Sequence, residues 1–102
     1  MRFEQFWEKL RNELKDNVEL STVDYNTPFQ AKFDDAKIII TPISSGEEYY
    51  LSQNQLEKAW KLTMNLSDEQ RFKYQIYKLN NVQQPSYTIA LLRIFTKNKI
   101  ME

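Results

Sequence analysis

The chain has 102 residues, of which 41% are hydrophobic and 27% charged, a composition that predicts one compact globular domain spanning residues 1–102. It contains no cysteine, no histidine and one glycine, which excludes disulfides, thiolate or imidazole metal sites, Ser–His or Cys–His nucleophile pairs, and the glycine-rich loops of conventional nucleotide-binding enzymes. No apolar run approaches the roughly 20 residues of a membrane span and the first ten residues lack a signal-peptide core, so we expect a reduced, cytoplasmic setting.

Charge is divided unevenly along the chain. Residues 1–57 contain 6 Lys or Arg and 11 Asp or Glu, a net charge of −5, whereas residues 58–102 contain 8 and 3, a net charge of +5. Such a division can steer an anionic partner toward one end of the molecule. It can equally reflect complementary faces of one domain, or charges that intermix in the fold.

An N-terminal helix is predicted by apolar residues that recur at steps of three and four. This stripe consists of Phe3, Phe6, Trp7, Leu10 and Leu14. After Asn17 the period changes to two, which predicts strands. The apolar face of these strands comprises Val18, Leu20, Thr22, Phe29, Ala31 and Phe33, and Gln30, Lys32 and Asp34 face away.

Two further turns are predicted to join successive strands into an antiparallel meander. Residues 34–36, DDA, are predicted to turn the chain into a β-rich strand over 37–43. Gly46 is the only glycine, and glycine enters positive φ without a Cβ penalty, so we predict a two-residue hairpin tip at residues 45–46. A strand over 47–51 would follow.

Residues 52–55, SQNQ, have the spacing of a capping box, with Leu51 and Leu56 in the positions of a hydrophobic staple. They predict the start of a second helix. Its inner stripe consists of Leu56, Ala59, Trp60, Thr63 and Met64.

A third helix over 68–79 is predicted because residues 67–70, SDEQ, repeat the cap pattern. Residues 71–78, RFKYQIYK, also alternate as a strand would, and the cap favours the helix. Asn80 and Asn81 break the segment. Pro85 then precedes a predicted N-cap at Ser86, and the sequence YTIALLRIFTK predicts a mostly buried final helix.

These elements predict an α+β fold with an N-terminal helix, a small antiparallel meander of three or four strands, and two or three C-terminal helices. The residues expected to be mainly buried are Phe6, Leu10, Phe29, Phe33, Ile38, Ile40, Leu56, Trp60, Leu91 and Ile94.

The chain resembles a family of small bacterial α+β modules whose pattern runs Thr-x-x-x-x-Pro-Phe, then Ser-Gly, then Ser-x-Tyr-x-x-Ala-Leu-Leu. The stretches TPFQAKF, SSG and PSYTIALL carry this resemblance, which covers residues 18–95. The matching positions are Pro28, Phe29, Ser45, Gly46, Leu51, Tyr87, Ala90, Leu91 and Leu92. Such modules are associated with bacterial defence and mobile-element proteins, so the resemblance implies nucleic acid as a nearby partner.

Catalysis is not expected from the residues that remain. Asp24 followed by residues 35–37, DAK, is similar to the acid and acid-x-lysine arrangement with which restriction-type nucleases hold a divalent metal. The pattern is short, and residues 34–35 lie where a hairpin needs solvated turn residues. We therefore predict no catalytic residue, no metal site and no cofactor.

Basic and aromatic residues interleave after residue 57. A helix over 68–79 would turn Phe72, Ile76 and Leu79 inward, leave Arg71, Tyr74, Gln75 and Lys78 as an outer stripe, and flank that stripe with Lys73 and Tyr77. Lys and Arg bind phosphates and tyrosines stack on unpaired bases. The candidate nucleic-acid-binding residues are Arg71, Lys73, Tyr74, Lys78, Arg93 and Lys97. The competing interpretation is a solvated lysine rim around half-buried tyrosines.

The sequence thus predicts a non-enzymatic accessory module that binds nucleic acid, or a protein associated with it, through the basic C-terminal half. The alternative is a protein-interaction module, an inhibitor or adaptor, that presents an acidic N-terminal half to a basic partner surface. Its acidic residues are Glu4, Glu8, Glu13, Asp16, Glu19 and Asp24.

Overall fold

The computed structural model describes residues 2–96 and confirms the predicted α+β class. One N-terminal helix precedes a four-stranded antiparallel sheet, and the remaining helices follow it. The elements are α1 (Phe3–Glu13), β1 (Val18–Ser21), β2 (Pro28–Asp34), β3 (Lys37–Pro42), β4 (Tyr49–Ser52), α2 (Gln53–Met64), α3 (Tyr74–Leu79) and α4 (Pro85–Thr96).

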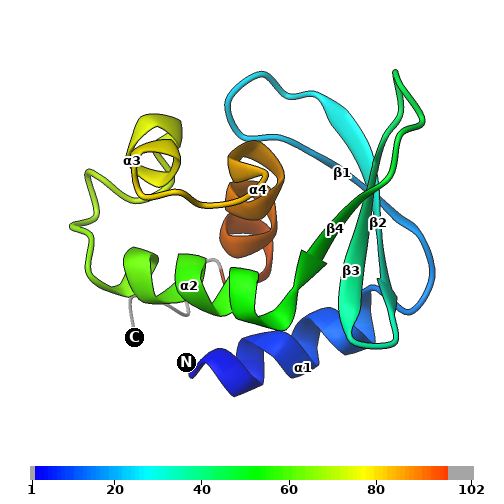
Figure 1. Cartoon of the computed structure of the whole chain (residues 1–102), viewed down its shortest axis with the longest axis horizontal. Helices are drawn as coiled ribbons and strands as arrows, with labels where there is room; N and C mark the ends of the chain where they lie inside the picture. The colour runs from blue at the N-terminus through cyan, green and yellow to red at the C-terminus, as the bar shows by residue number, and fades with distance from the viewer. Residues whose placement is uncertain (1, 97–102) are drawn as a thin grey trace.

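The sheet is a meander in which spatial order follows chain order, β1-β2-β3-β4. Its longest pairing joins β2 and β3 in the register Phe29↔Pro42 through Asp34↔Lys37. Figure 1 shows the helices gathered on one side of this sheet, with α4 beside it and α3 farther out. The arrangement is helices packed on one face of an antiparallel sheet, as the sequence predicts.

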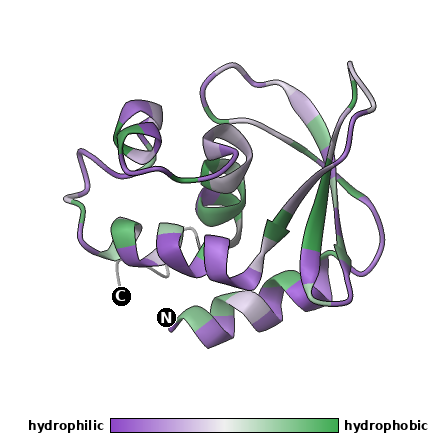
Figure 2. Cartoon of the chain, in the orientation of Figure 1, coloured by the Kyte–Doolittle hydropathy of each residue, from purple (hydrophilic) through white to green (hydrophobic). Residues whose placement is uncertain are grey.

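Period-two alternation sorts the strand residues between the two faces of the sheet. Phe29, Ala31, Ile38 and Ile40 are fully buried beneath the helices, and Figure 2 shows hydrophobic residues along β3. Lys32, on the opposite face, is exposed, and Ile39 on that face is half-buried. One face therefore supplies the core and the other faces solvent.

Aromatic contacts join α1 to α2 and to β2 in this core. The rings of Phe6 and Trp60 stack with centroids 5.0 Å apart, and Trp7 meets Phe33 edge-on at 5.0 Å. Phe6 is completely buried and Trp60 nearly so. The apolar stripe predicted for α1 is confirmed, because all of its members are buried.

Two apolar predictions need correction, whereas Phe33, near the end of β2, is half-buried against the core with the Arg11 guanidinium 5.3 Å from its ring centroid. Ile94, in the last turns of α4, is 40% exposed. Met64 ends α2 and is also exposed, although the helical period places it on the inner stripe. The last turn of a helix can extend past the core against which its earlier turns pack. The helical period of the sequence does not show where this happens.

The capping box predicted at the start of α2 is confirmed. The Ser52 hydroxyl accepts a hydrogen bond from the Gln55 backbone N–H at 3.2 Å, and the Gln55 side-chain oxygen accepts one from the Ser52 N–H at 2.8 Å. Leu51 and Leu56 are both fully buried on either side of this cap. Two backbone donors of the first turn are thereby satisfied.

The tightest hairpin is not at the glycine. β2 and β3 are joined by Asp35 and Ala36 alone, with Asp35 at φ +60°. The connection from β3 to β4 spans residues 43–48, and within it the Gly46 N–H donates to the Pro42 carbonyl at 2.9 Å. The predicted two-residue tip at 45–46 is therefore wrong in length, whereas the hairpin between these strands is present.

Gly46 has φ +71°, and nothing lies within 4 Å of where a Cβ would be. We expect Gly46→Ala to lower the free energy of unfolding by about 1 kcal/mol, because the left-handed region penalises a side chain even in open space. Gly46→Asn should cost less, since asparagine tolerates this region. Urea unfolding of both variants measures the difference, and an unchanged Gly46→Ala variant would contradict the backbone explanation.

Within residues 2–96, no helix has both the length and the apolar character needed to cross a membrane.

Candidate functional site

The segment before α3 departs from the sequence prediction. Residues 67–71 form a turn in which the Gln70 and Arg71 N–H groups donate to the Ser67 carbonyl. Phe72 then adopts φ +69°, so the helix begins only at Tyr74. The predicted helix over 68–79 is right in type and wrong in its start. Positive φ at a bulky residue is rare, and no pattern in the sequence predicts it here.

The later start changes which residues of α3 face the core. Tyr77, predicted to flank an outer stripe, is fully buried, and Leu79, predicted to face inward, is 78% exposed. Six residues make less than two turns of helix. Their orientation is therefore set by the preceding turn rather than by the helical period.

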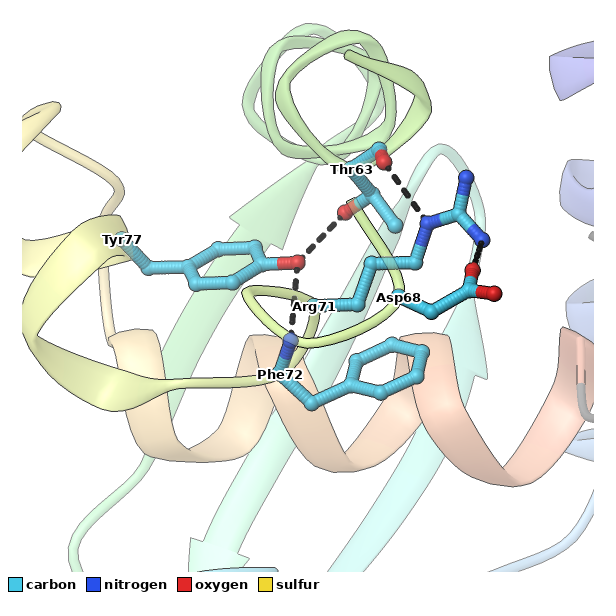
Figure 3. Close-up of polar contacts among 5 residues, drawn as sticks. All are labelled: Thr63, Asp68, Arg71, Phe72 and Tyr77. Carbon is cyan, nitrogen blue, oxygen red and sulfur yellow. Dashed lines mark hydrogen bonds and ion pairs between the residues drawn. The ribbon is translucent and has the colours of Figure 1, made fainter. Parts of the chain in front are cut away.

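Tyr77 is held by the two hydrogen bonds in Figure 3, one buried and one partly buried. The Thr63 hydroxyl donates to the Ala59 carbonyl at 2.8 Å, so its one proton is used and the Tyr77 hydroxyl, also at 2.8 Å, must donate to Thr63. The Tyr77 oxygen in turn accepts a long hydrogen bond from the Phe72 N–H at 3.5 Å. Burial raises the pKa of Tyr77, so the hydroxyl stays protonated and links α2, the turn and α3.

Arg71, a predicted phosphate contact, faces the protein instead. Its Nε donates to the Thr63 carbonyl at 3.2 Å and its Nη1 pairs with the Asp68 carboxylate at 2.7 Å (Figure 3). Its side chain is only 16% exposed. The guanidinium thus fastens the turn to the C-terminal end of α2.

The chain leaves α3 through a Schellman motif at the two asparagines. The Val82 N–H donates to the Tyr77 carbonyl and the Asn81 N–H to the Lys78 carbonyl, both at 3.1 Å, with Asn81 at φ +60°. Val82 is buried. Pro85 is itself the first residue of α4, so the predicted N-cap at Ser86 is wrong by two positions and Ser86 lies inside the helix.

An open groove of about 420 Å³ lies where the β1–β2 loop, the start of α3 and the start of α4 meet. Its lining residues are Asp24, Tyr25, Tyr74, Gln75 and Ser86. Tyr25 is 85% exposed, the most exposed large apolar side chain among residues 2–96. Exposed aromatic side chains around a concavity are a common basis of ligand binding.

Asp24 is fixed within this groove. Its Oδ2 accepts from the Ser86 hydroxyl at 2.9 Å, and its Oδ1 accepts from the Tyr25 N–H at 2.9 Å. Desolvation raises the pKa of Asp24, but hydrogen bonds from Ser86, the Tyr25 backbone and Thr22 together outweigh it and hold this pKa below its usual value. The groove therefore carries a carboxylate at neutral pH, next to the N-terminal turn of α4.

Two of the predicted binding residues lie close together, and one of them is at this groove. Tyr74 lines the groove, and the Lys78 Nζ, which is not part of the lining, lies 5.9 Å from the Tyr74 ring centroid. Lys73 is exposed and directly precedes Tyr74. Arg93 is exposed about two turns beyond Ser86 on α4 and is not a lining residue. Lys97 lies outside the described residues.

The sequence analysis did not single out Tyr25, and it considered Asp24 only as a metal ligand or as one of the acidic residues of a protein-interaction surface. Asp24 precedes β2 and Asp35 follows it, so a seven-residue strand separates these two carboxylates. No group of three or more His, Cys, Asp or Glu residues within 2–96 is placed to hold a metal ion. The actual partner of Asp24 is Ser86, 62 residues away in the chain.

Comparisons of this chain with models of protein families, with curated proteins and with solved structures give no match. The resemblance to small bacterial defence-associated modules therefore stays a prediction. Function is accordingly inferred from the groove itself.

Proposed function

We propose that this protein is a non-enzymatic module that binds single-stranded nucleic acid at the Tyr25–Tyr74 groove. The observation that carries the proposal is that two tyrosines line one concavity, while the Lys78 ammonium, outside this lining, lies 5.9 Å from the Tyr74 ring centroid. Aromatic faces accept stacked bases of any sequence. An adjacent ammonium can contact the phosphate that joins such bases.

Exposure of Tyr25 favours unpaired bases over duplex. Tyr25 projects from the loop between β1 and β2 and is 85% exposed, so its ring has a free face for stacking. Bases in a duplex are already stacked on one another and offer no face to a side chain. A single strand, whose bases can be splayed, fits such a wall better.

The alternative, an acidic surface for a basic protein partner, has less support. On α1, Glu8 lies 3.7 Å from Arg11 in an ion pair, and Lys9 is close by along the same helix. The exposed surface of α1 is therefore mixed in charge rather than a continuous acidic stripe.

Salt dependence of binding tests the role of the lysines. We expect the variant Lys73→Glu/Lys78→Glu to bind a short single strand more weakly and with a shallower salt dependence. On a single strand, the log–log slope should fall by about 0.7 for each phosphate that the variant no longer neutralises. Both side chains are exposed, so the fold should not change.

The matched control is Lys15→Glu/Lys32→Glu, which changes the net charge equally at exposed positions after α1 and on the outer face of the sheet. Fluorescence anisotropy between about 20 and 200 mM salt spans the range over which such contacts weaken. Equal losses of affinity and slope in both variants would mean that net charge, and not the groove, determines binding.

A further inference from the structure

We propose that Asp24 reads the bound base by accepting a hydrogen bond from an exocyclic amine, so that the groove favours cytosine over thymine or uracil. This inference rests on the proposed binding of single strands and specifies which base the groove accepts. Asp24 shares the groove wall with both tyrosines. A base stacked on either ring would therefore direct its polar edge into the concavity that contains this carboxylate.

The carboxylate retains acceptor capacity for such a contact. An ionised carboxylate offers about four lone-pair positions. Ser86 and the Tyr25 backbone occupy one position on each oxygen, and a Thr22 side-chain hydrogen bond also contributes. These three donors leave about one of the four positions unused, and Asp24 is an exposed residue that lines the groove.

These same bonds position the carboxylate before a ligand arrives. The Ser86 hydroxyl ties Oδ2 to α4, and the Tyr25 N–H ties Oδ1 to the loop that also carries the Tyr25 ring. The acceptor and one stacking surface therefore belong to adjacent residues. Preorganisation of this kind lowers the entropic cost of binding.

Hydrogen-bond chemistry then determines which bases fit. Cytosine presents an amine at position 4, which donates to Asp or Glu, whereas thymine and uracil present a carbonyl oxygen there. The thymine or uracil carbonyl and an ionised carboxylate are both acceptors, so no hydrogen bond forms between them. Their oxygen atoms carry negative charge and repel each other. The two pyrimidines otherwise stack with rings of the same size, so comparing them isolates this contact.

The experiment titrates the full chain with fluorescein-labelled oligodeoxycytidine and oligothymidine of equal length, at neutral pH and low salt. We expect wild-type protein to bind the cytidine strand about tenfold more tightly, within the range for a good base contact. Asp24→Asn should reduce this ratio to about one, because an amide can donate to the thymine carbonyl as well as accept from the cytosine amine. Asp34→Asn, at the opposite end of β2, removes the same charge and should keep the tenfold preference.

Thermal unfolding of Asp24→Asn verifies that this variant is folded. The variant Asp24→Glu retains a carboxylate and should therefore retain a preference for the cytidine strand. Equal wild-type affinity for the two strands would overturn the base-reading role and leave the proposed function in place. A cytidine preference that survives in Asp24→Asn would overturn the assignment to Asp24. If neither strand binds, both this inference and the proposed function are overturned. Binding of an arginine-rich peptide in their place would favour the alternative, an acidic surface for a basic protein partner.

Discussion

Replacing Tyr77 with alanine should lower the free energy of unfolding by about 3–5 kcal/mol, the range for removing a large aromatic side chain from a core. Tyr77 is completely buried, and its hydroxyl connects α2 to the turn before α3. The variant loses packing and hydrogen bonds together. Urea or thermal unfolding followed by circular dichroism measures the loss, and Tyr74→Ala, half-buried on the same short helix, should lose much less stability.

A double-mutant cycle separates the hydroxyl from the ring. Tyr77→Phe should cost about 1–3 kcal/mol, because it removes a buried bond and leaves the Phe72 N–H without this acceptor. Thr63→Val removes the partner hydroxyl, and the double variant should be less destabilised than the sum of the two singles, since the Tyr77–Thr63 hydrogen bond is lost only once. Strict additivity, or a Tyr77→Phe variant as stable as wild type, would show that the hydroxyl contributes nothing.

Local signals in the sequence were sufficient for much of this fold. The α1 stripe, the period-two strands and the capping box at Ser52 and Gln55 each depend on residues close together in the chain. These patterns reflect local geometry: the period of the helix, the alternation of side chains along a pleated strand, and the unpaired backbone N–H groups of the first helical turn. The α+β class followed because these elements come in chain order with short connections.

The same local signals failed where a distant contact determines the backbone. The cap pattern at residues 67–70 predicts a helix that starts six residues too early, because Phe72 takes positive φ. Arg71 bonds to Thr63 and the Tyr77 hydroxyl bonds to Phe72, and together they hold the turn against α2. Tertiary hydrogen bonds thus override the preference of the segment for helix.

The candidate site was predictable only in part, because it also depends on contacts between residues far apart in the chain. Tyr74 and Lys78 lie four residues apart on one helix, so their proximity follows from helical geometry and was predicted. Tyr25 and Asp24 reach the same groove from the β1–β2 loop, and the Ser86 bond that fixes Asp24 joins distant parts of the chain. No spacing rule connects a loop residue to a helix 62 positions away.

Removing the groove tyrosines should have the largest effect on ligand binding. Each stacked base contributes about 1–3 kcal/mol, which corresponds to a loss of roughly 5- to 150-fold in affinity for each tyrosine replaced by alanine. Tyr25→Ala should leave stability nearly unchanged, because this side chain is 85% exposed. Tyr50→Ala, which removes an exposed tyrosine from the outer face of the sheet, is the matched control and should bind as wild type does.

The most direct measurement is a low-salt anisotropy titration of a short labelled single strand with wild type, Tyr25→Ala, Tyr74→Ala and Tyr50→Ala, repeated with the duplex form of the same oligonucleotide. A groove that stacks unpaired bases predicts saturable binding that is tighter for the single strand than for the duplex. It further predicts weakening by Tyr25→Ala and Tyr74→Ala, but not by Tyr50→Ala. Absence of binding to the single strand, or equal affinities for wild type and the two groove variants, would contradict the proposal that this groove binds nucleic acid.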